Sequence, residues 1–363
     1  MSFNGGQPAG VLLRADASAS IGLGHCLRLL ALAEGMVRRG GSAVFVVGGQ
    51  SQCIASQLES RGFVVIPFWG KTGSDEDLRF VHKVGAAVGA HTVCIDGYGF
   101  PEGYYRQLRS EFVTVAMDDL ASQAFDVDLV INPNFAGEHL PYKTSHGTRL
   151  LCGADYILLR SEFTQWQLEK EEVDTVRGRV RHLLITFGGS DPTGGGARIL
   201  RALAGMAPMS ITVVLGAGFV EDSQFFPAVF SALADGHSVV LASQPSDMSN
   251  CIAWADAAIS ACGGTLWELA YFGIPVVGFS VVDNQDSIAA SLKKQDRIAG
   301  GQRLDSLSDS ELSEILSEFL RDREKRAELL RRFAEVVDGL GVERVLDGMD
   351  ECRIARSQGL RSA

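Results

Sequence analysis

The stretch VLLRADASASIGLGHCLRLLALAEGMVRR, residues 11–39, leads into a second apolar run, AVFVV, at residues 43–47. Both Val11–Arg14 and the run at 43–47 are short and mostly apolar, which is typical of parallel strands covered on both faces. Between them, apolar residues from Leu27 to Val37 recur at helical spacing. The pattern predicts a strand, a helix and a parallel strand, the unit of a doubly wound α/β sheet.

The same alternation continues along most of the chain. Further strands are predicted at 63–67, 92–96, 112–116 and 129–132, and in the second half at 183–187, 211–215, 239–242, 257–260 and 276–279. The predicted fold class is α/β with two Rossmann-like domains, whose parallel sheets face each other across a cleft. Ligands of such sheets bind at the carboxyl ends of the strands.

A polar, charge-rich stretch interrupts this rhythm and separates the two halves. We therefore predict an N-terminal Rossmann-like domain at residues 1–163, a linker at 164–180, a C-terminal Rossmann-like domain at 181–340 and a helical tail at 341–363. The clustered charges between Arg321 and Arg326 are interpreted as the solvated face of a helix.

The composition is typical of a globular protein and disfavours nucleic-acid-binding and membrane-spanning classes. The 363 residues are 46% hydrophobic and 21% charged, close to an average soluble globular protein. A net charge of −11 disfavours non-specific binding to nucleic acids, which requires neutralising phosphates. No apolar run is long enough to span a bilayer, and residues 1–10 lack the pattern of a secretory signal, so a cytoplasmic location is expected. Seven scattered cysteines without a C-x-x-C pair predict free thiols and no zinc site.

The first candidate site lies in the turn between the first strand and the first helix. Gly22 and Gly24 permit a tight turn, and the helix start behind them offers N–H groups to a phosphate. The positive end of the helix dipole disfavours a protonated imidazole, so His25 is a candidate general base. Asp16 is expected to orient the imidazole or a substrate hydroxyl, or to act as an ordinary acceptor in the loop.

This turn is neither a dinucleotide-binding fingerprint nor a P-loop. Leu27 stands where the third glycine of the fingerprint is required, and the second strand ends in Gly48 and Gly49 instead of an acidic residue. No G-x-x-x-x-G-K-[ST] motif is present. We therefore predict no cofactor, and because no clustered set of metal ligands appears in the sequence, we predict no metal ion.

A second candidate site follows a strand in the C-terminal half. Ser260 ends the strand, Gly263 and Gly264 form the turn, and Thr265 begins a helix whose N–H groups suit a diphosphate. Glu268 lies three residues after Thr265, which matches a capping box. The alternative is that its carboxylate accepts hydrogen bonds from ribose hydroxyls, and the spacing alone does not separate the two.

Two further loops follow strands in the same half. The motif T-F-G-G-S-D-P places Gly188, Gly189 and Ser190 where they could contact phosphates or a sugar, or form an ordinary strand-to-helix turn. Asn284 and Gln285 follow another strand and bring amide groups to the edge of the sheet.

Taken together, these motifs resemble the UDP-sugar hydrolases of pseudaminic acid biosynthesis and their relatives of the spore-coat polysaccharide type. The motifs that carry the resemblance are R-A-D-A-S-x-x-I-G-x-G-H (14–25), I-D-x-Y (95–98), Y-x-L-L-R-x-E-F (156–163), F-G-G-S-D-P (187–192), G-G-T-L-W-E-L-x-x-x-G-I-P (263–275) and D-N-Q (283–285). The resemblance implies a GT-B-like fold and release of UDP from UDP-2,4-diacetamido-2,4,6-trideoxy-β-L-altrose, with water attacking the anomeric carbon.

Carried over by position, the resemblance implies that His25 is the catalytic histidine. It places Asp16, Tyr98 and Asn284 near the sugar, and Gly24, Gly264, Thr265 and Glu268 on the UDP-binding side. The stretch after the histidine, Cys26 to Leu29, departs from the V-M-R-C common in the family, which leaves the exact sugar open.

The main alternative is a glycosyltransferase of the same fold, which would pass the sugar to a sugar or lipid acceptor. A UDP-sugar-binding protein without catalytic activity is the other alternative. The expected partner is a UDP-sugar, with no nucleic acid and no membrane span. The sequence leaves the oligomeric state open, and a monomer is compatible with it.

Overall fold

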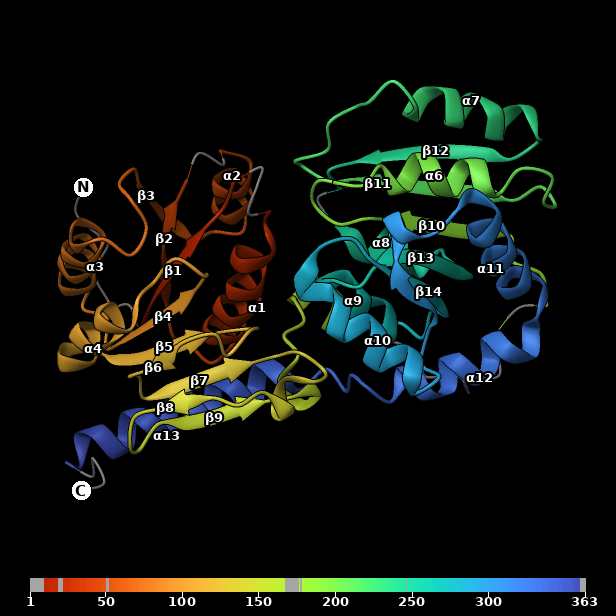
Figure 1. Ribbon diagram of the computed structural model, residues 1–363. Coiled ribbons are helices and arrows are strands. Elements are labelled where there is room, and N and C mark those ends of the chain that lie inside the picture. The colour runs from red at the N-terminus through yellow and green to blue at the C-terminus, as the bar shows by residue number, and fades with distance from the viewer. Residues whose placement is uncertain are drawn as a thin grey trace. The chain divides into compact units, whose positions relative to one another are not determined.

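The structure is a computed structural model that describes residues 10–18, 22–49, 52–166, 176, 178–245 and 247–359 (Figure 1). The chain divides into two compact units. The first comprises the residues up to Ser161 together with those from Gly339 onward, and the second comprises Glu162–Asp338. Each unit has its own parallel sheet and its own hydrophobic core.

A seven-stranded sheet forms the centre of the first unit, with strand order β3-β2-β1-β4-β5-β7-β9. Every neighbouring pair is parallel. The strands are β1 (Val11–Asp16), β2 (Ala43–Gly48), β3 (Val64–Phe68), β4 (Thr92–Asp96), β5 (Val113–Met117), β7 (Leu129–Asn132) and β9 (Arg149–Cys152). A separate two-stranded sheet pairs β6 (Ala124–Phe125) with β8 (Lys143–Thr144).

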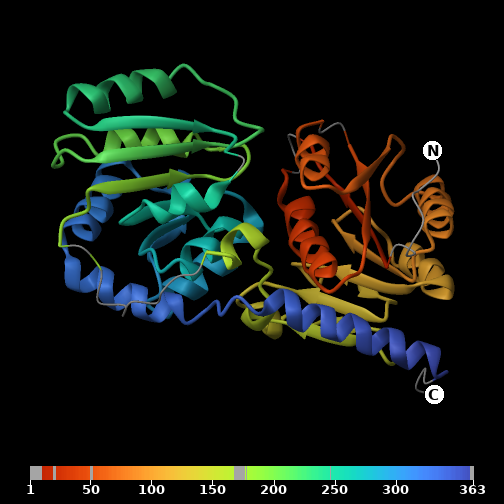
Figure 2. The same cartoon turned by 180° about the vertical axis from the view of Figure 1, so that it is seen from behind.

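Helices cover both faces of this sheet. They are α1 (Gly24–Arg38), α2 (Gln52–Ser60), α3 (Asp75–Val88), α4 (Glu102–Glu111) and α13 (Gly341–Ser357), and the unit also contains the 3-10 turns η1 (Gly137–His139) and η2 (Ala154–Tyr156). The short α5 (Ser161–Thr164) lies where the chain passes from the first unit to the second. Leu29 of α1 and Val345 of α13 share one core with the sheet, and Leu78 and Tyr105 belong to the core on the opposite face. Figure 2 shows α13 lying along the strands of this unit.

The last helix therefore completes the N-terminal unit. Val342, Leu346 and Met349 of α13 are buried in the core that also contains α1. Close packing explains the glycine that begins α13, because a Cβ on Gly341 would lie 2.1 Å from the Ile157 carbonyl oxygen. Sequence analysis had separated residues 341–363 as a tail, since a helix with apolar and charged positions does not identify its partner.

A six-stranded parallel sheet forms the centre of the second unit, in the order β12-β11-β10-β13-β14-β15. The strands are β10 (His182–Thr186), β11 (Ser210–Leu215), β12 (Ser238–Ser243), β13 (Ala257–Ala261), β14 (Val276–Ser280) and β15 (Ala299–Arg303). The helices are α6 (Gly195–Ala202), α7 (Phe225–Ala234), α8 (Met248–Ala253), α9 (Gly264–Tyr271), α10 (Asp286–Lys294), α11 (Asp309–Arg321) and α12 (Arg323–Ala334), with the 3-10 turns η4 (Asp283–Gln285) and η5 (Leu304–Ser306).

The prediction of two parallel α/β sheets is confirmed, and each predicted strand corresponds to an observed one within one or two residues at its ends. Sequence analysis missed β9 and β15, the edge strands that complete the two sheets. Both are less apolar than the central strands, because an edge strand is covered less completely. The predicted linker at 164–180 lies largely outside the described residues, of which only 164–166, 176 and 178–180 belong to it.

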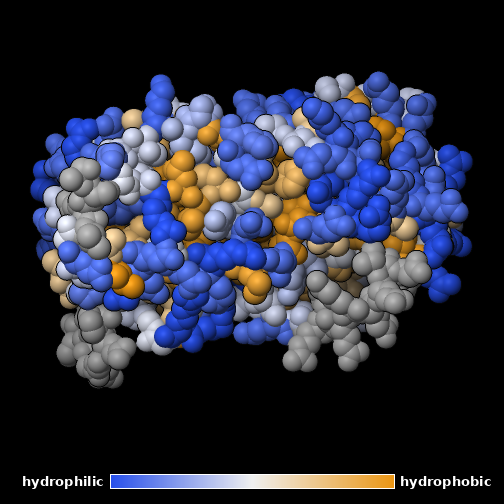
Figure 3. Space-filling model, turned by 90° about the horizontal axis from the view of Figure 1, so that it is seen from below, coloured by the Kyte–Doolittle hydropathy of each residue, from blue (hydrophilic) through white to orange (hydrophobic). Residues whose placement is uncertain are grey.

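Hydrophilic side chains predominate on the face of the molecule in Figure 3, and hydrophobic ones gather in patches between them. Among the helices in the described part of the chain, none is both long and apolar enough to cross a membrane.

Candidate functional site

The first group of candidate residues lies where β1, β4 and β5 end. These strands are neighbours, with Ala15 beside Asp96 and Asp96 beside Met117 in the sheet register. Their carboxyl ends therefore bring the loops that follow them to one edge of the sheet, the usual ligand edge of a doubly wound fold. The turn that follows β1 leads into α1 and His25.

His25 is held in one orientation at the start of α1. Its Nδ1 atom lies 2.6 Å from Oδ1 of Asp96, and only 7% of the residue is exposed. Because Asp96 as a carboxylate only accepts hydrogen bonds, Nδ1–H is the donor and Nε2 is left for proton exchange. The Tyr98 ring meets the imidazole edge to face, with 4.9 Å between the ring centroids. An imidazole oriented in this way can accept a proton at Nε2.

Arg28 lies one helical turn after His25 and compensates the charge of Asp96. Its Nε and Nη2 atoms donate to the two Asp96 oxygens at 3.0 and 2.7 Å. Its Nη1 atom donates to Oδ1 of Asp119 at 2.6 Å. Burial lowers the pKa of Arg28, but Asp119 and Asp96 outweigh it and raise that pKa well above its usual value. The guanidinium therefore remains charged and joins the two carboxylates.

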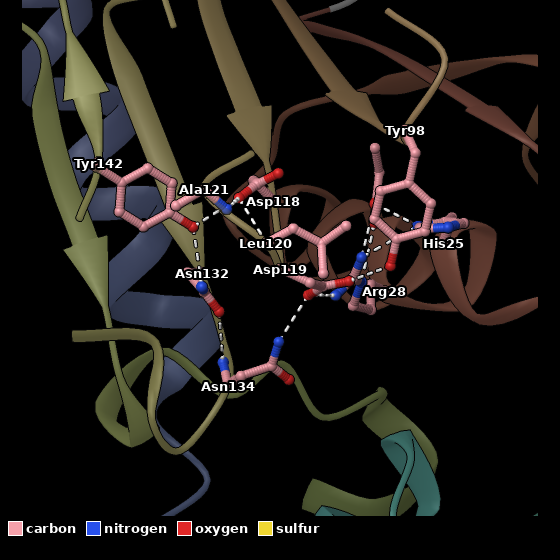
Figure 4. A network of polar contacts seen from close by, with 11 residues as sticks. His25, Arg28, Tyr98, Asp118, Asp119, Leu120, Ala121, Asn132, Asn134 and Tyr142 are labelled. Atoms are coloured by element: carbon pink, nitrogen blue, oxygen red, sulfur yellow. Dashed lines mark hydrogen bonds and ion pairs between the residues drawn. The ribbon is translucent and has the colours of Figure 1, made fainter. Parts of the chain in front are cut away.

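Asp119 gathers three donors in the loop after β5 (Figure 4). Besides Arg28, its carboxylate accepts hydrogen bonds from Tyr98 Oη at 2.8 Å and Asn134 Nδ2 at 2.7 Å. Burial alone would raise the pKa of Asp119, but Arg28 and Tyr98 lower it to about 2. This carboxyl group is therefore ionised at neutral pH, and it connects Tyr98 to the residues that hold His25.

Asp16 does not orient the imidazole, and Asp96 does so instead. The two Asp16 oxygens accept from Arg14 Nη1 and Thr72 Oγ1, each at 2.6 Å. Arg14 is itself fully buried and is also paired with Asp77 at 2.9 Å. Asp16 is thus an acceptor inside a buried charge network, which corresponds to the structural alternative considered for it.

The two glycines before His25 leave room at the start of α1. Gly22 has a φ of +80°, a conformation that favours glycine. A Cβ added at Gly22 or Gly24 would meet no described atom within 4 Å. Within the described residues, no side chain caps this helix start. The described atoms therefore leave open space beside Gly22 and Gly24 at the start of α1.

The second group of candidate residues lies at the start of α9 in the other unit. The N-cap residue is Gly263, which has no side chain, and among the described residues none caps the helix from elsewhere. A Cβ on Gly264 would meet no described atom within 4 Å, whereas one on Gly263 would lie 3.4 Å from Gln285 Nε2. The structure therefore brings Gly263, Gly264, Thr265 and Gln285 together at a helix start suited to an anion.

The predicted capping box at this helix is wrong. It required Thr265 at the N-cap, but Thr265 is the second residue of α9 because the helix begins at Gly264. Glu268 is half-buried one turn into the helix. Since the capping role is removed, the ribose contact remains the functional alternative for Glu268.

Two other predicted residues differ in how a ligand could reach them. Asn284 is exposed in η4, after β14, beside Gln285. Ser260 is only 1% exposed in β13, and its hydroxyl donates to the Ala261 carbonyl at 2.9 Å. We therefore remove Ser260 from the candidate ligand contacts, since its hydroxyl is buried within the sheet.

In the loop after β10, the carboxylate of Asp191 lies at the start of α6. Asp191 has a φ of +46°, and its carboxylate accepts from the backbone N–H groups of Gly195 at 2.6 Å and Gly196 at 2.8 Å. The Gly189 carbonyl accepts from Gly218 N at 2.7 Å. Gly188, Gly189 and Ser190 therefore belong to a turn whose helix start is already occupied by a carboxylate.

Sequence reasoning did not assign roles to Asp96, Arg28, Asp119 or Asn134. Asp96 ends a predicted strand, which was a usable signal because carboxyl ends carry function in this fold. Asp119 and Asn134 follow the next two strands along the sheet, β5 and β7. What the sequence lacked was the pairing of these separate loops with one arginine.

The described residues contain no group of three or more His, Cys, Asp or Glu side chains arranged to hold a metal ion.

Comparison with known proteins identifies two distant relatives by sequence, and no family model matches the chain. The chain is 23% identical over 342 residues to the spore coat polysaccharide biosynthesis protein SpsG of Bacillus subtilis, covering 91% of this chain and 95% of that protein. It is 24% identical over 271 residues to an uncharacterized protein of Methanocaldococcus jannaschii, covering 72% of this chain. The chain spans about half the length of that archaeal protein, 54%.

Solved structures establish the fold class. MurG of Acinetobacter baumannii is similar with a TM-score of 0.62, 14% identity and coverage of 95% of this chain and 100% of MurG. The S. aureus MnaA–UDP co-structure gives a TM-score of 0.65, 10% identity and 98% coverage of both chains. The UDP-GlcNAc 2-epimerase of Neisseria meningitidis bound to UDP-GlcNAc gives 0.60, 10% and coverage of 94% and 100%. The predicted GT-B-like fold is confirmed.

Proposed function

We propose that the protein hydrolyses a UDP-linked 2,4-diacetamido-2,4,6-trideoxy sugar and releases UDP and the free sugar, in the biosynthesis of a nonulosonic acid such as pseudaminic acid. The observation that carries the proposal is the His25–Asp96 pair, 2.6 Å between Nδ1 and Oδ1, beside the open glycine turn. The sequence relation to a spore coat polysaccharide biosynthesis protein and the fold shared with proteins solved with UDP or a UDP-sugar support it.

In this proposal His25 activates water. Asp96 holds the proton on Nδ1, so that Nε2 takes a proton from the water as its oxygen bonds to the anomeric carbon. The bond from that carbon to the diphosphate oxygen breaks, and UDP leaves with the electron pair. Arg28 stays paired with Asp96 and stabilises its negative charge before the imidazole gains the proton.

The proposal assigns the diphosphate to the start of α9. Backbone N–H groups at Gly264 and Thr265 and the positive end of the helix dipole stabilise the charge that develops on the leaving group. The amide of Gln285 lies beside Gly263 and adds a donor there. Glu268 is assigned to the ribose hydroxyls. These donors need no metal ion to support a leaving diphosphate.

Transfer of the sugar to an acceptor is the second candidate function, and one observation favours it. Large apolar side chains are exposed on the loops that follow β3, β4 and β5: Trp69 is 73% exposed, Tyr98 49% and Leu120 43%. Aromatic and apolar groups at the ligand edge of the sheet suit the ring of an acceptor sugar or a lipid. Both functions would use the same UDP site.

Incubation with candidate UDP-sugars in oxygen-18 water, without acceptor, separates these functions. Hydrolysis at the anomeric carbon releases UDP, and the label enters the sugar with inverted configuration. Label in UDP would instead indicate attack at phosphorus and contradict the mechanism. UDP release that requires an added sugar or lipid, with no label in the product, would identify a transferase.

His25→Ala tests the base directly. We expect turnover to fall by roughly two to four orders of magnitude, the usual effect of losing a general base. UDP affinity measured by calorimetry should stay within about twofold, because the diphosphate is assigned to α9. The exposed His91 provides a matched control, and His91→Ala should leave both quantities unchanged. Near-normal turnover in His25→Ala would remove His25 from the mechanism.

A further inference from the structure

The two side chains that hold His25 converge on one further carboxylate. Asp96 is bridged by Arg28 to Asp119, with Arg28 Nη1 2.6 Å from Asp119 Oδ1. Tyr98, whose ring packs against the imidazole, donates its hydroxyl proton to Asp119 Oδ2 at 2.8 Å. One Asp119 oxygen therefore binds Arg28, which is paired with Asp96, and the other binds Tyr98, which packs against the His25 ring (Figure 4).

We propose that Asp119 is a positioning residue that fixes the imidazole of His25 from two sides, through Arg28 and through Tyr98. The inference deepens the proposed function, on which its activity readout rests. Asp119 does not act on substrate itself, since its side chain is only 10% exposed and its oxygens are used by Arg28, Tyr98 and Asn134. Its role is to fix the positions of Arg28 and Tyr98, which in turn fix the imidazole of His25.

Asp119 is itself fixed by the loop on which it lies. The preceding carboxylate, Asp118, accepts from the backbone N–H groups of Leu120 at 2.9 Å and Ala121 at 2.6 Å, and from Tyr142 Oη at 2.8 Å. Ala121 has a φ of +50°, which the surrounding hydrogen bonds maintain. The loop after β5 therefore presents Asp119 in a defined place.

The same contact determines what Tyr98 can do. Asp119 is ionised at neutral pH, so the Tyr98 hydroxyl proton remains in the hydrogen bond between them. Tyr98 therefore acts through the packing of its ring and through the lone pairs of its oxygen, and it does not supply a proton to a leaving group. Protonation near the departing UDP is assigned to no side chain of this network.

The first test is a spectroscopic one that does not depend on activity. The ring resonances of His25 are recorded in histidine-labelled protein, assigned with His25→Gln, and compared with those of Tyr98→Leu, which has no ring beside the imidazole. Asp119→Ala and Tyr98→Phe both break the hydrogen bond to the Tyr98 hydroxyl. We expect both to move the His25 resonances toward their positions in Tyr98→Leu. Unchanged resonances in Tyr98→Phe and Asp119→Ala would overturn the proposal.

The second test measures turnover where the wild-type protein releases UDP. Misplacement of the base should lower kcat by roughly 10- to 100-fold in Asp119→Ala, with UDP affinity unchanged. The double variant Tyr98→Phe/Asp119→Ala should lose less than the sum of the single effects, because both changes break the same hydrogen bond. Additive losses would overturn the coupling.

The controls separate failure of this inference from failure of the proposed function. Glu59→Ala removes an exposed carboxylate of the same unit and should change neither readout. If Asp119→Ala does not fold, Tyr98→Phe still tests the same hydrogen bond, because it removes only one hydroxyl group. A wild-type protein that releases no UDP would contradict the proposed function, while the His25 resonances would still decide the role of Asp119.

Discussion

Two helices of the second unit begin with similar sequences, but within the described residues a carboxylate lies at the start of one and not at the start of the other. Both α6 and α9 are eight residues long, and each follows a buried strand, has a glycine at its N-cap and begins with a glycine. At α6 the carboxylate of Asp191 accepts the N–H groups of Gly195 and Gly196. At α9 the N-cap position holds Gly263, and no other side chain in the described part of the chain replaces it.

The comparison teaches that a glycine-rich turn before a helix does not by itself mark a phosphate site. The helix dipole attracts one anion at each start, and at α6 the protein supplies its own. Burial raises the pKa of Asp191, although the N–H groups of Gly196 and Gly195 act in the opposite direction. A diphosphate at α6 would have to displace or approach a buried carboxyl group, whereas at α9 it would meet N–H donors.

The largest effect is expected from giving α9 the carboxylate that α6 has. In Gly263→Asp the new side chain can cap the helix, since Gly263 has a φ of −106° that other residues adopt. Its negative charge would repel the diphosphate, and UDP affinity measured by calorimetry should fall roughly 100-fold, or about 2.7 kcal/mol. Thermal stability should change by only a few tenths of a kcal/mol, as for glycine and aspartate N-caps.

Gly263→Asn is the matched control for that experiment. Asparagine caps a helix about as well as aspartate but has no charge. Its effect on UDP affinity should be clearly smaller than that of Gly263→Asp. Equal UDP affinities of the wild type and Gly263→Asp would show that the diphosphate binds elsewhere.

An intermediate effect is expected from removing the carboxylate of α6. Asp191→Gly removes the carboxylate that accepts the N–H groups of Gly195 and Gly196 without adding strain, because glycine readily adopts the φ of +46° found there. The protein should lose about 1 kcal/mol of stability in thermal unfolding, the usual effect of removing a side chain that accepts N–H groups at a helix start. UDP affinity should remain within about twofold. A tenfold change in either direction would place the loop after β10 in the UDP site.

An effect of similar size, on UDP binding and not on stability, is expected at Glu268. Glu268→Gln keeps the size of the side chain and removes its charge, so a ribose contact should weaken UDP binding by roughly 3- to 10-fold. Since Thr265 is not the N-cap of α9, little change in melting temperature is expected. Unchanged UDP affinity would contradict the ribose role.

Much of the fold could be predicted from local sequence. Central strands such as β4 and β13 are buried along their whole length, and their apolar runs identified them. The edge strands β9 and β15 were missed, since partial exposure weakens the apolar pattern. The placement of α13 in the first unit could not be predicted, because its partner α1 lies some 300 positions away in the chain.

In the candidate sites, too, local features could be predicted from the sequence and distant contacts could not. The glycine turn with His25 and the turn with Gly263 were identifiable, because glycines, a histidine and helix starts are local features of the sequence. The hydrogen-bond partners of Asp16 and Asp191 could not be identified from the sequence. Asp16 ends β1 and Asp191 lies in the turn after β10, but one pairs with Arg14 and the other accepts N–H groups at the start of α6.

The sequence by itself determined the alternation of strands and helices, the two parallel sheets and the turns at which their ligand edges lie. These follow from hydrophobic periodicity and from the conformational freedom of glycine, which act over a few residues. Only the tertiary structure decided which carboxylate orients His25. Asp96, Arg28 and Asp119 come from three separate elements, and they meet because β1, β4 and β5 are neighbours in the sheet. Strand order places distant residues side by side, and no local pattern in the sequence encodes that contact.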